Sequence, residues 1–180
     1  MGNQLARVAH RTTTDTSIAP SERNDRWLTP LPIVNALGVF DLDPCAAPNH
    51  PTATAMWTPE NGHDGLEEEW FGRVWMNPPY GRVMRQWVDR LVEHGSGTML
   101  IPVATGTKLW MDAAWPNASA IHFWRHRVKF LRRDGLDDDM VSPAASALVA
   151  FGDFDAEALL TSGLPGVALD FRHQAEAPHE

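Results

Sequence analysis

Cysteine and long apolar runs are nearly absent from this sequence. Its one cysteine, Cys45, excludes an intrachain disulfide and fits a reducing compartment. No apolar run approaches the roughly 20 residues that a membrane-spanning helix needs. The first residues, Met1 to Pro20, contain no apolar stretch of signal-peptide length. We therefore expect a cytoplasmic protein without a membrane partner.

Positive charge is scarce as well. The chain has 15 lysine and arginine residues against 23 aspartate and glutamate residues, a formal net charge of −8. This balance counts against nonspecific wrapping of nucleic acid, because phosphate neutralisation needs cations. Five cations nevertheless gather within residues 122–133, namely Arg125, Arg127, Lys129, Arg132 and Arg133. They predict a local binding face for an anionic partner; the alternative is a solvated strand edge with Val128 and Phe130 facing inward.

The length of 180 residues suits one domain with a full core. Residues 1–22 lack periodicity and are expected to be a disordered N-terminal arm. The folded domain is expected over residues 23–172, followed by a flexible tail over 173–180.

Apolar spacing and turn residues predict alternating strands and helices. Helices are expected over residues 31–37, 83–94, 108–114 and 156–162, with a helical turn at 66–71. Strands are expected over 39–43, 53–57, 73–76, 98–103, 120–124 and 146–151, and a polar loop over 132–143. Thr29 is the expected N-cap of the first helix and Gly38 its stop. This alternation implies an α/β sheet with parallel neighbours.

The motif Asn77-Pro78-Pro79-Tyr80 directly follows the apolar strand predicted at 73–76. An exocyclic amine on a nucleobase is a poor nucleophile, because its lone pair is delocalised into the ring. The side-chain oxygen of Asn77 and the carbonyl of Pro78 can accept both amine protons, and two prolines hold that carbonyl rigidly. Tyr80 offers a flat face for stacking a base that has left the duplex. The plain alternative is that these residues are only a turn.

Taken with other motifs, this loop resembles the phage-type DNA N6-adenine methyltransferase family. That family belongs to the amino-methyltransferases with an (Asp/Asn/Ser)-Pro-Pro-(Tyr/Phe/Trp) loop. The resemblance covers residues 26–152, and its most specific part is the combination of two segments. These are Phe40-Asp41-Leu42-Asp43-Pro44-Cys45-Ala46 and Trp75-Met76-Asn77-Pro78-Pro79-Tyr80-Gly81.

The resemblance implies an α/β, Rossmann-like S-adenosylmethionine-dependent methyltransferase fold with a mostly parallel sheet. It implies a site-specific enzyme that methylates N6 of adenine in double-stranded DNA, with Asn77 to Tyr80 as its catalytic loop. The five cations would then hold DNA phosphates. A phage- or prophage-encoded protein acting in a bacterial host, as a monomer or homodimer, is also implied. From Pro44 to Asn77 the chain is too short for two strand–helix units of roughly 30 residues each, so we expect a trimmed first half.

The same resemblance assigns a pocket for S-adenosylmethionine. Its expected members are Trp27, Thr29, Pro30, Asp41, Asp43, Pro44, Cys45, Ala46, Met56, Trp57, Asp64 and Leu66. Asp43 ends a predicted strand, where its carboxylate can meet the cationic amino group of the cofactor. Ligands of open α/β sheets bind beyond the carboxyl ends of the strands, so adjacent strands at 39–43 and 73–76 would bring both motifs to one edge. The alternative for Asp41 and Asp43 is an acidic loop after an edge strand.

Other functions stay open from the sequence alone. The closest is methylation of N4 of cytosine, which the same loop could activate. Pro44-Cys45 is also found in cytosine-C5 methyltransferases, but this chain lacks their Glu-Asn-Val tripeptide. Protein-glutamine methyltransferases carry a helical N-terminal domain and a glycine-rich loop that are missing here, and a non-catalytic cofactor- or DNA-binding module is a further alternative. His122 and His126 are expected to be core or surface residues, so no metal site is predicted.

Overall fold

The computed structural model describes residues 27–131, 137–142 and 144–172. Seven strands form one mixed sheet in the order β2-β1-β3-β4-β8-β5-β9, and two more form a separate hairpin, β6-β7. The sheet strands are β1 (Leu42–Asp43), β2 (Ala55–Met56), β3 (Val74–Met76), β4 (Gly97–Pro102), β5 (Ala120–Trp124), β8 (Ser146–Phe151) and β9 (Gly166–Asp170). The hairpin strands are β6 (Lys129–Leu131) and β7 (Asp137–Val141).

The sheet has a parallel half and an antiparallel half. Strands β2, β1, β3 and β4 run parallel to one another. Strand β8 lies antiparallel between β4 and β5, and β9 lies antiparallel beside β5. The predicted mostly parallel sheet is therefore wrong, and the sheet is mixed. The physical reason is that the chain returns from β5 to β8 through a hairpin without a crossover helix, which leaves neighbouring strands antiparallel.

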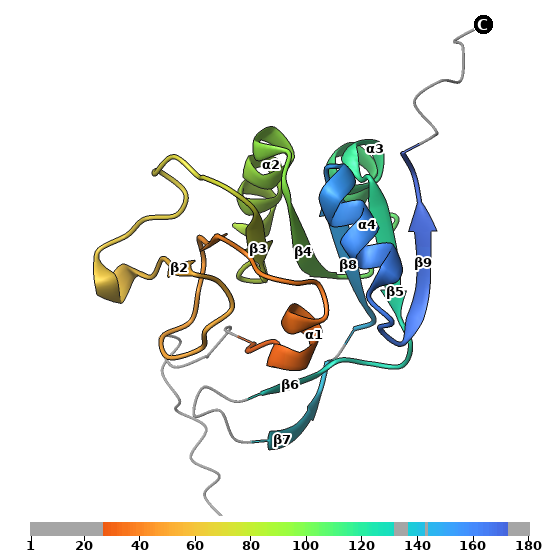
Figure 1. Ribbon diagram of the computed structural model, residues 1–180, viewed down its shortest axis with the longest axis horizontal. Coiled ribbons are helices and arrows are strands. Elements are labelled where there is room, and N and C mark those ends of the chain that lie inside the picture. Colours follow the sequence, from red (N-terminus) through yellow and green to blue (C-terminus); the bar gives the residue numbers. More distant parts are fainter. Residues whose placement is uncertain (1–26, 132–136, 143, 173–180) are drawn as a thin grey trace, which may run out of the picture.

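Helices cover both faces of the sheet (Figure 1). On one face lie α1 (Leu31–Asn35) and α4 (Asp153–Thr161), and on the other lie α2 (Met84–His94) and the segment of η3 (Trp110–Ala114) and α3 (Trp115–Asn117). The 3-10 turn η2 (Pro59–Asn61) follows β2. Each face has its own core because strand side chains alternate: Val74 and Met76 pack toward α2, whereas Trp75 packs toward α1.

Helix α2 shows why the sequence folds locally as it does. Its buried residues Met84, Trp87, Val88 and Leu91 recur at helical spacing and face the sheet. Gly95 then ends the helix in the left-handed conformation, donating its N–H to the carbonyl of Leu91.

Most predicted elements are confirmed, with shorter bounds for the early strands. Between Pro44 and Asn77, all of which is described, no α-helix occurs, so the trimmed first half is confirmed. Four details differ. Strands β6 and β9 were not predicted, and β7 occupies part of the predicted loop 132–143. Helix α1 has no side-chain N-cap, because the Thr29 hydroxyl is engaged elsewhere.

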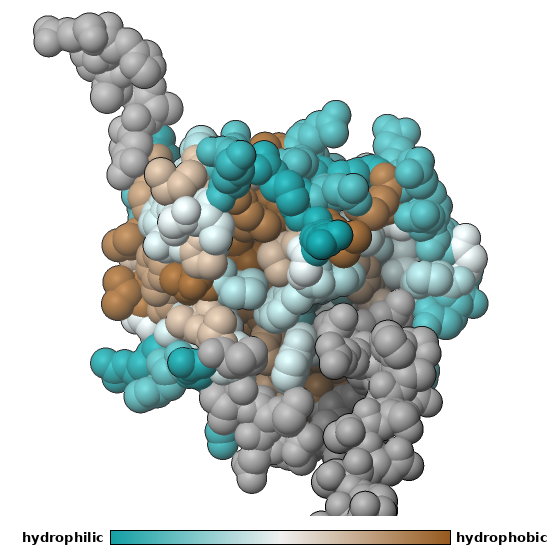
Figure 2. Space-filling model, turned by 180° about the vertical axis from the view of Figure 1, so that it is seen from behind, coloured by the Kyte–Doolittle hydropathy of each residue, from teal (hydrophilic) through white to brown (hydrophobic). Residues whose placement is uncertain are grey.

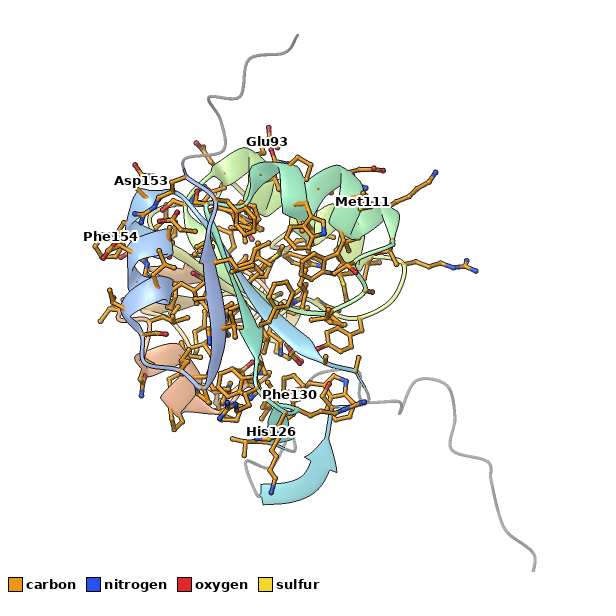
Figure 3. All side chains as sticks on the ribbon, turned by 90° about the vertical axis from the view of Figure 1, so that its right-hand side faces the viewer. Glu93, Met111, His126, Phe130, Asp153 and Phe154 are labelled. Carbon is orange, nitrogen blue, oxygen red and sulfur yellow. The ribbon has the colours of Figure 1, made fainter. Side chains whose placement is uncertain are left out.

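The β6–β7 hairpin docks against the segment before α1. Leu28 forms a bridge with Leu131, and the rings of Trp27 and Phe130 lie 5.6 Å apart. Figure 3 shows Phe130 between the hairpin and the sheet, whereas Phe154 projects outward from α4. This contact joins residues about 100 positions apart in the chain, and it places the hairpin next to the carboxyl end of β3.

Strand β9 forms the edge of the sheet opposite β2. In the part of the chain that the structure describes, β9 pairs only with β5, and its Val167 and Leu169 are exposed. Seen from behind, apolar patches gather toward this edge among hydrophilic ones (Figure 2). Within the described residues, no helix is long and apolar enough to cross a membrane.

Candidate active site

Strands β1 and β3 lie side by side and point the same way, with Leu42 opposite Val74. From this pair the chain continues outward in opposite directions, from β1 to the edge strand β2 and from β3 to β4. The gap between their carboxyl ends is therefore the topological switch point, where open α/β sheets bind ligands. Asp43 ends β1 and Asn77 follows β3 directly, so the two predicted motifs meet at one edge.

A narrow cavity of about 30 Å³ opens at this point, with room for one or two waters. Four segments of the chain meet around it. Its lining residues are Trp27, Leu28, Thr29, Asp43, Cys45, Ala47, His50, Thr52, Trp75, Asn77, Pro78 and Pro79.

Asn77 presents an unpaired oxygen within this site. Its side-chain Nδ2 donates to the carbonyl of Trp27 at 2.6 Å and to the hydroxyl of Thr29 at 3.2 Å. Its Oδ1 is fully buried and has no hydrogen-bond partner among the described residues. A buried acceptor without a partner costs about 1–3 kcal/mol, so this oxygen is poised for a donor that is supplied by a ligand.

Asp43 is a buried carboxylate in the same cavity. Its side chain accepts hydrogen bonds from the Thr52 hydroxyl and the Cys45 backbone N–H, but no cationic side chain of the described chain pairs with it. Asp43 is only 4% exposed, and burial raises its pKa to about 6. A buried carboxylate of this kind favours a cationic partner, which would lower that pKa again.

Two polar residues of this cavity, His50 and Thr52, were not predicted from the sequence. The ring of His50 donates from Nε2 to the Thr29 carbonyl at 2.8 Å, and burial lowers the pKa of His50. Thr52 donates to Asp43. Both lie in the loop between β1 and β2, which has no regular periodicity, and only their polarity next to prolines could have drawn attention to them.

A wider groove of about 440 Å³ adjoins the narrow cavity and shares Cys45 and Pro79 with it. This size lies within the usual range for small-molecule sites. Its lining residues are Pro44, Cys45, Ala46, Trp57, Pro59, Gly62, His63, Asp64, Gly65, Pro79 and Trp87.

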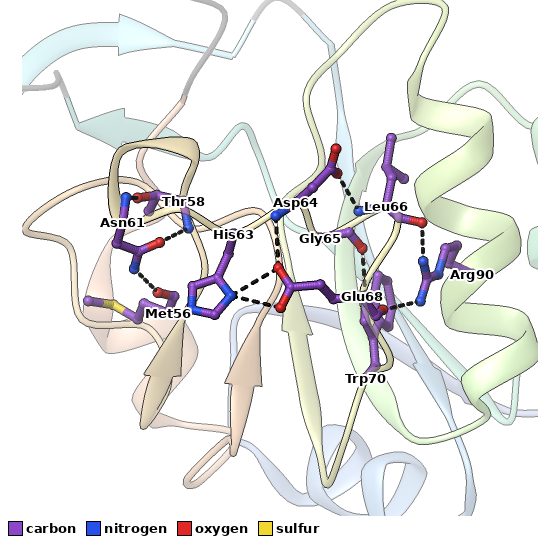
Figure 4. Close-up of polar contacts among 10 residues, drawn as sticks. All are labelled: Met56, Thr58, Asn61, His63, Asp64, Gly65, Leu66, Glu68, Trp70 and Arg90. Carbon is purple, nitrogen blue, oxygen red and sulfur yellow. Dashed lines mark hydrogen bonds and ion pairs between the residues drawn. The ribbon is translucent and has the colours of Figure 1, made fainter.

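The wall of the groove is held by hydrogen bonds among residues 56–70 (Figure 4). Thr58 and Asn61 bond reciprocally through side chain and backbone. His63 stacks on Trp57 with ring centroids 5.1 Å apart and bonds the carboxylate of Glu68, which holds the pKa of Glu68 below its usual range. These contacts present one aromatic face and several polar groups to the groove.

Gly65 brings two stretches of backbone into contact at the groove. A Cβ atom at this position would lie 2.0 Å from the Pro44 carbonyl oxygen and 2.9 Å from the ring of Trp87. The Gly65 carbonyl accepts a hydrogen bond from Trp70 Nε1 at 2.7 Å, which anchors the turn. The loop after β1 is thereby fixed against the wall of the groove.

Five predicted site residues lie outside both cavities. Asp41 sits at the amino end of β1, where its carboxylate accepts the Arg73 backbone N–H at 2.7 Å. The backbone carbonyl of Met56 accepts a hydrogen bond from the Asn61 side chain, and that of Leu66 accepts one from Arg90. Pro30 directly precedes α1. Tyr80 is partly buried against the core beside α2, its hydroxyl has no partner among the described residues, and burial raises its pKa to about 12.

The predicted basic face is described in part. Arg125, Arg127 and Lys129 are exposed on the β5–β6 turn and β6, while Val128 and Phe130 between them are buried. The guanidinium of Arg127 also donates to the Ser142 carbonyl. Arg132 and Arg133 lie outside the described residues. His122, by contrast, is a core histidine with 2% exposure that bonds the Leu164 carbonyl.

This edge thus combines a buried acceptor, a buried carboxylate and a nucleoside-sized groove. Such a set can bind a cationic ligand beside a polar N–H donor. A family model described as DNA N-6-adenine-methyltransferase (Dam) matches residues 16–164 of the chain. Neither the curated proteins nor the solved structures contain a significant match.

Proposed function

Since the chain belongs to the DNA N-6-adenine-methyltransferase family, we propose that the β1–β3 edge is the active site at which it methylates adenine. Enzymes of this family modify the N6 amine of adenine in DNA, and the chain is such an enzyme. The family match gives no support to cytosine N4 as the target.

The buried Oδ1 of Asn77 is the observation that supports this assignment. One N–H of the adenine amine would donate to this oxygen and the other to the Pro78 carbonyl, which draws the nitrogen toward a tetrahedral shape and frees its lone pair. The nitrogen would then be free to accept a methyl group from a sulfonium donor, whose carbon–sulfur bond would break to leave a neutral thioether, and would lose one proton to solvent. Pro78 and Pro79 keep the carbonyl fixed, because neither can rotate about φ. The rate gain comes from oriented hydrogen bonds and needs no ionised base.

S-adenosylmethionine fits the remaining groups as methyl donor, and when bound it supplies a methyl group on a positively charged sulfur. Asp43 is a buried carboxylate that no cation of residues 27–131, 137–142 or 144–172 pairs with, and it would hold the amino group of the cofactor. The adjoining groove offers Trp57 and Asp64 to an adenosine. Since Cys45 and Pro79 line both spaces, donor and acceptor would meet beside Asn77.

Double-stranded DNA is the proposed substrate, held at the exposed cations between β5 and the end of β6. Arg125 and Lys129 are exposed there, on the structural unit that packs against Trp27 in the cavity wall. Phosphates on this face would place a flipped adenine near Asn77, and the base must leave the helix because its amine is otherwise paired. A protein that only binds DNA would have no use for the unpaired Asn77 oxygen.

The test is incubation of the protein with duplex DNA and S-adenosylmethionine carrying a labelled methyl group, followed by nucleoside analysis. We expect label in N6-methyl-2′-deoxyadenosine for the wild type and a loss of about 100- to 1,000-fold in kcat for Asn77→Ala, with cofactor affinity retained. Asn35→Ala, an exposed asparagine on α1, is the matched control and should keep full activity. Label in N4-methylcytosine, or full turnover by Asn77→Ala, would contradict the proposal.

A further inference from the structure

The segment from Trp27 to Thr29 does more than line the cavity. We infer that Thr29 is a positioning residue that fixes the Asn77 carboxamide with its oxygen toward the reacting amine. This inference rests on the proposed function of Asn77. It differs from the expectation that Thr29 contacts the cofactor.

The orientation of Asn77 follows from the chemistry of its two neighbours. The Trp27 carbonyl can only accept a hydrogen bond, so the atom 2.6 Å from it must be the amide nitrogen. The second amide proton goes to the Thr29 hydroxyl at 3.2 Å. With both protons engaged on one side, Oδ1 is directed to the other side. An amide that turned over would bring its oxygen against the Trp27 carbonyl, where two acceptors repel.

Thr29 is itself held on two sides. It is 2% exposed, so its hydroxyl is shielded from bulk solvent. Its carbonyl accepts the hydrogen bond from His50, and its neighbour Leu28 accepts one from the Leu131 backbone N–H at 2.9 Å. The hydroxyl therefore has a fixed position relative to β3 and the hairpin.

This arrangement connects strand β6, which carries Lys129, to the loop that begins at Asn77. Strand β6 holds Leu28 through its backbone and Trp27 through Phe130, and the same segment holds Asn77. Lys129 on β6 is thus connected to Asn77 through its neighbour Phe130 and through Trp27. Loss of the Thr29 hydroxyl would release one amide proton and allow the carboxamide to rotate about its last torsion angle.

The experiment compares Thr29→Val, which keeps the shape and removes the hydroxyl, with Thr29→Ser, which keeps the hydroxyl. For Thr29→Val we expect kcat to fall by about 10- to 100-fold, since small misplacements of catalytic groups have effects of this size. The KM for DNA and the calorimetric Kd for S-adenosylmethionine should stay unchanged, and Thr29→Ser should restore kcat. Thr54→Val is the matched control, because the exposed Thr54 also bonds a carbonyl but lies away from both cavities.

A spectroscopic readout separates positioning from folding. The side-chain amide resonances of Asn77, identified by their absence in Asn77→Ala, should exchange slowly with solvent in the wild type and faster in Thr29→Val. A Thr29→Val enzyme with wild-type kcat, an equal loss in Thr29→Ser, or a loss confined to cofactor affinity would each overturn the inference. These outcomes leave the proposed function intact, which fails instead if the wild type forms no N6-methyladenine.

Discussion

Two buried carboxylates lie at opposite ends of the same sheet, and they differ in whether a described cation pairs with them. Asp155, 1% exposed, faces the amino ends of β3 and β4, where it accepts hydrogen bonds from Arg73 at 2.7 Å and from Thr98 at 3.2 Å. Asp43, at the carboxyl end of β1, receives hydrogen bonds from Thr52 and Cys45 but no cation. Among the described residues, a countercharge is supplied at the Asp155 end only.

This difference separates a carboxylate that serves the fold from one that serves a ligand. Arg73 also donates to the carbonyls of Leu37 and Val39 and lies 4.0 Å over the ring of Phe40, so the Asp155 end joins α1, β3 and α4. At the Asp43 end, burial disfavours the ionised carboxylate, and a bound cation would stabilise it. Substitutions at the two ends should accordingly change different properties.

The largest effect is expected at the paired end. Asp155→Ala leaves the Arg73 guanidinium buried without its countercharge, and removal of one partner of such a pair costs about 3–5 kcal/mol. Denaturant unfolding followed by circular dichroism should show this loss in the free energy of unfolding. The double variant Arg73→Met with Asp155→Leu should recover much of it, because apolar pairs replace buried ion pairs well. Equal instability of the single and double variants would remove the distinction between the two ends.

The opposite sign is expected at the unpaired end. Burial raises the pKa of Asp43 to about 6 in the folded state, so ionisation opposes folding by about 3 kcal/mol at most at neutral pH. Stability should fall as pH rises from about 4 to about 6 and stay lower above that. Asp43→Asn should remove this slope, stabilise the ligand-free protein by about 1–3 kcal/mol above pH 6, and weaken S-adenosylmethionine binding.

Urea unfolding between pH 4 and 8 and calorimetric titration of the cofactor measure both effects of Asp43→Asn. Thr54→Val, which removes a hydrogen bond near β2 without altering charge, is a suitable control for the pH dependence. A variant that is less stable at pH 8, or that binds the cofactor as well as the wild type does, would mean that Asp43 is a structural residue like Asp155.

A smaller effect should come from the basic face near the same end. Alanine at both Arg125 and Lys129 removes two exposed cations and should leave thermal stability unchanged. If both contact phosphates, the slope of log Kd for duplex DNA against log salt should fall by about 2. Arg172→Ala, which removes a cation bonded to Asp170 beside β9, should not alter this slope. An unchanged slope in the double variant would move the DNA site elsewhere.

The smallest effect is expected for Cys45→Ser. The thiol donates to the Asn77 carbonyl at 3.6 Å, and a thiol is only a weak donor. Since the proposed chemistry needs no thiolate, activity should stay within about twofold of the wild type. Complete inactivation of this variant in the labelled-methyl assay would instead favour covalent catalysis by Cys45.

Strongly patterned segments could be predicted from the sequence. Helix α2 has an apolar face and a terminal Gly95, and the loop from Asn77 follows an apolar strand, so both were identifiable. Strand β9 was missed because its Val167 and Leu169 are exposed on an edge, where no alternation of burial marks a strand. The parallel direction of the sheet was overestimated because the placement of β8 depends on tertiary pairing.

In the site, too, some residues could be predicted from sequence patterns, whereas others are placed by tertiary contacts. Asp43 and Asn77 were predicted together because strands of known direction bring their ends to one edge. Asp41 differs from Asp43 by two positions, and only the strand bounds reveal that it lies at the other end of β1, bonded to Arg73. His50 and Thr52 belong to a loop whose path is set by long-range contacts with Thr29 and Asp43. The disordered arm over residues 1–22 and the tail over 173–180 stay predictions.

The contact at Gly65 has an evolutionary consequence. Since any side chain there would overlap the Pro44 carbonyl, sequence drift at this position is blocked unless the loop after β1 moves at the same time. In a library randomised at codon 65 and selected for methylation, glycine alone should survive. Relatives that carry another residue here must have altered the neighbouring turn as well, and the two positions should change as a pair.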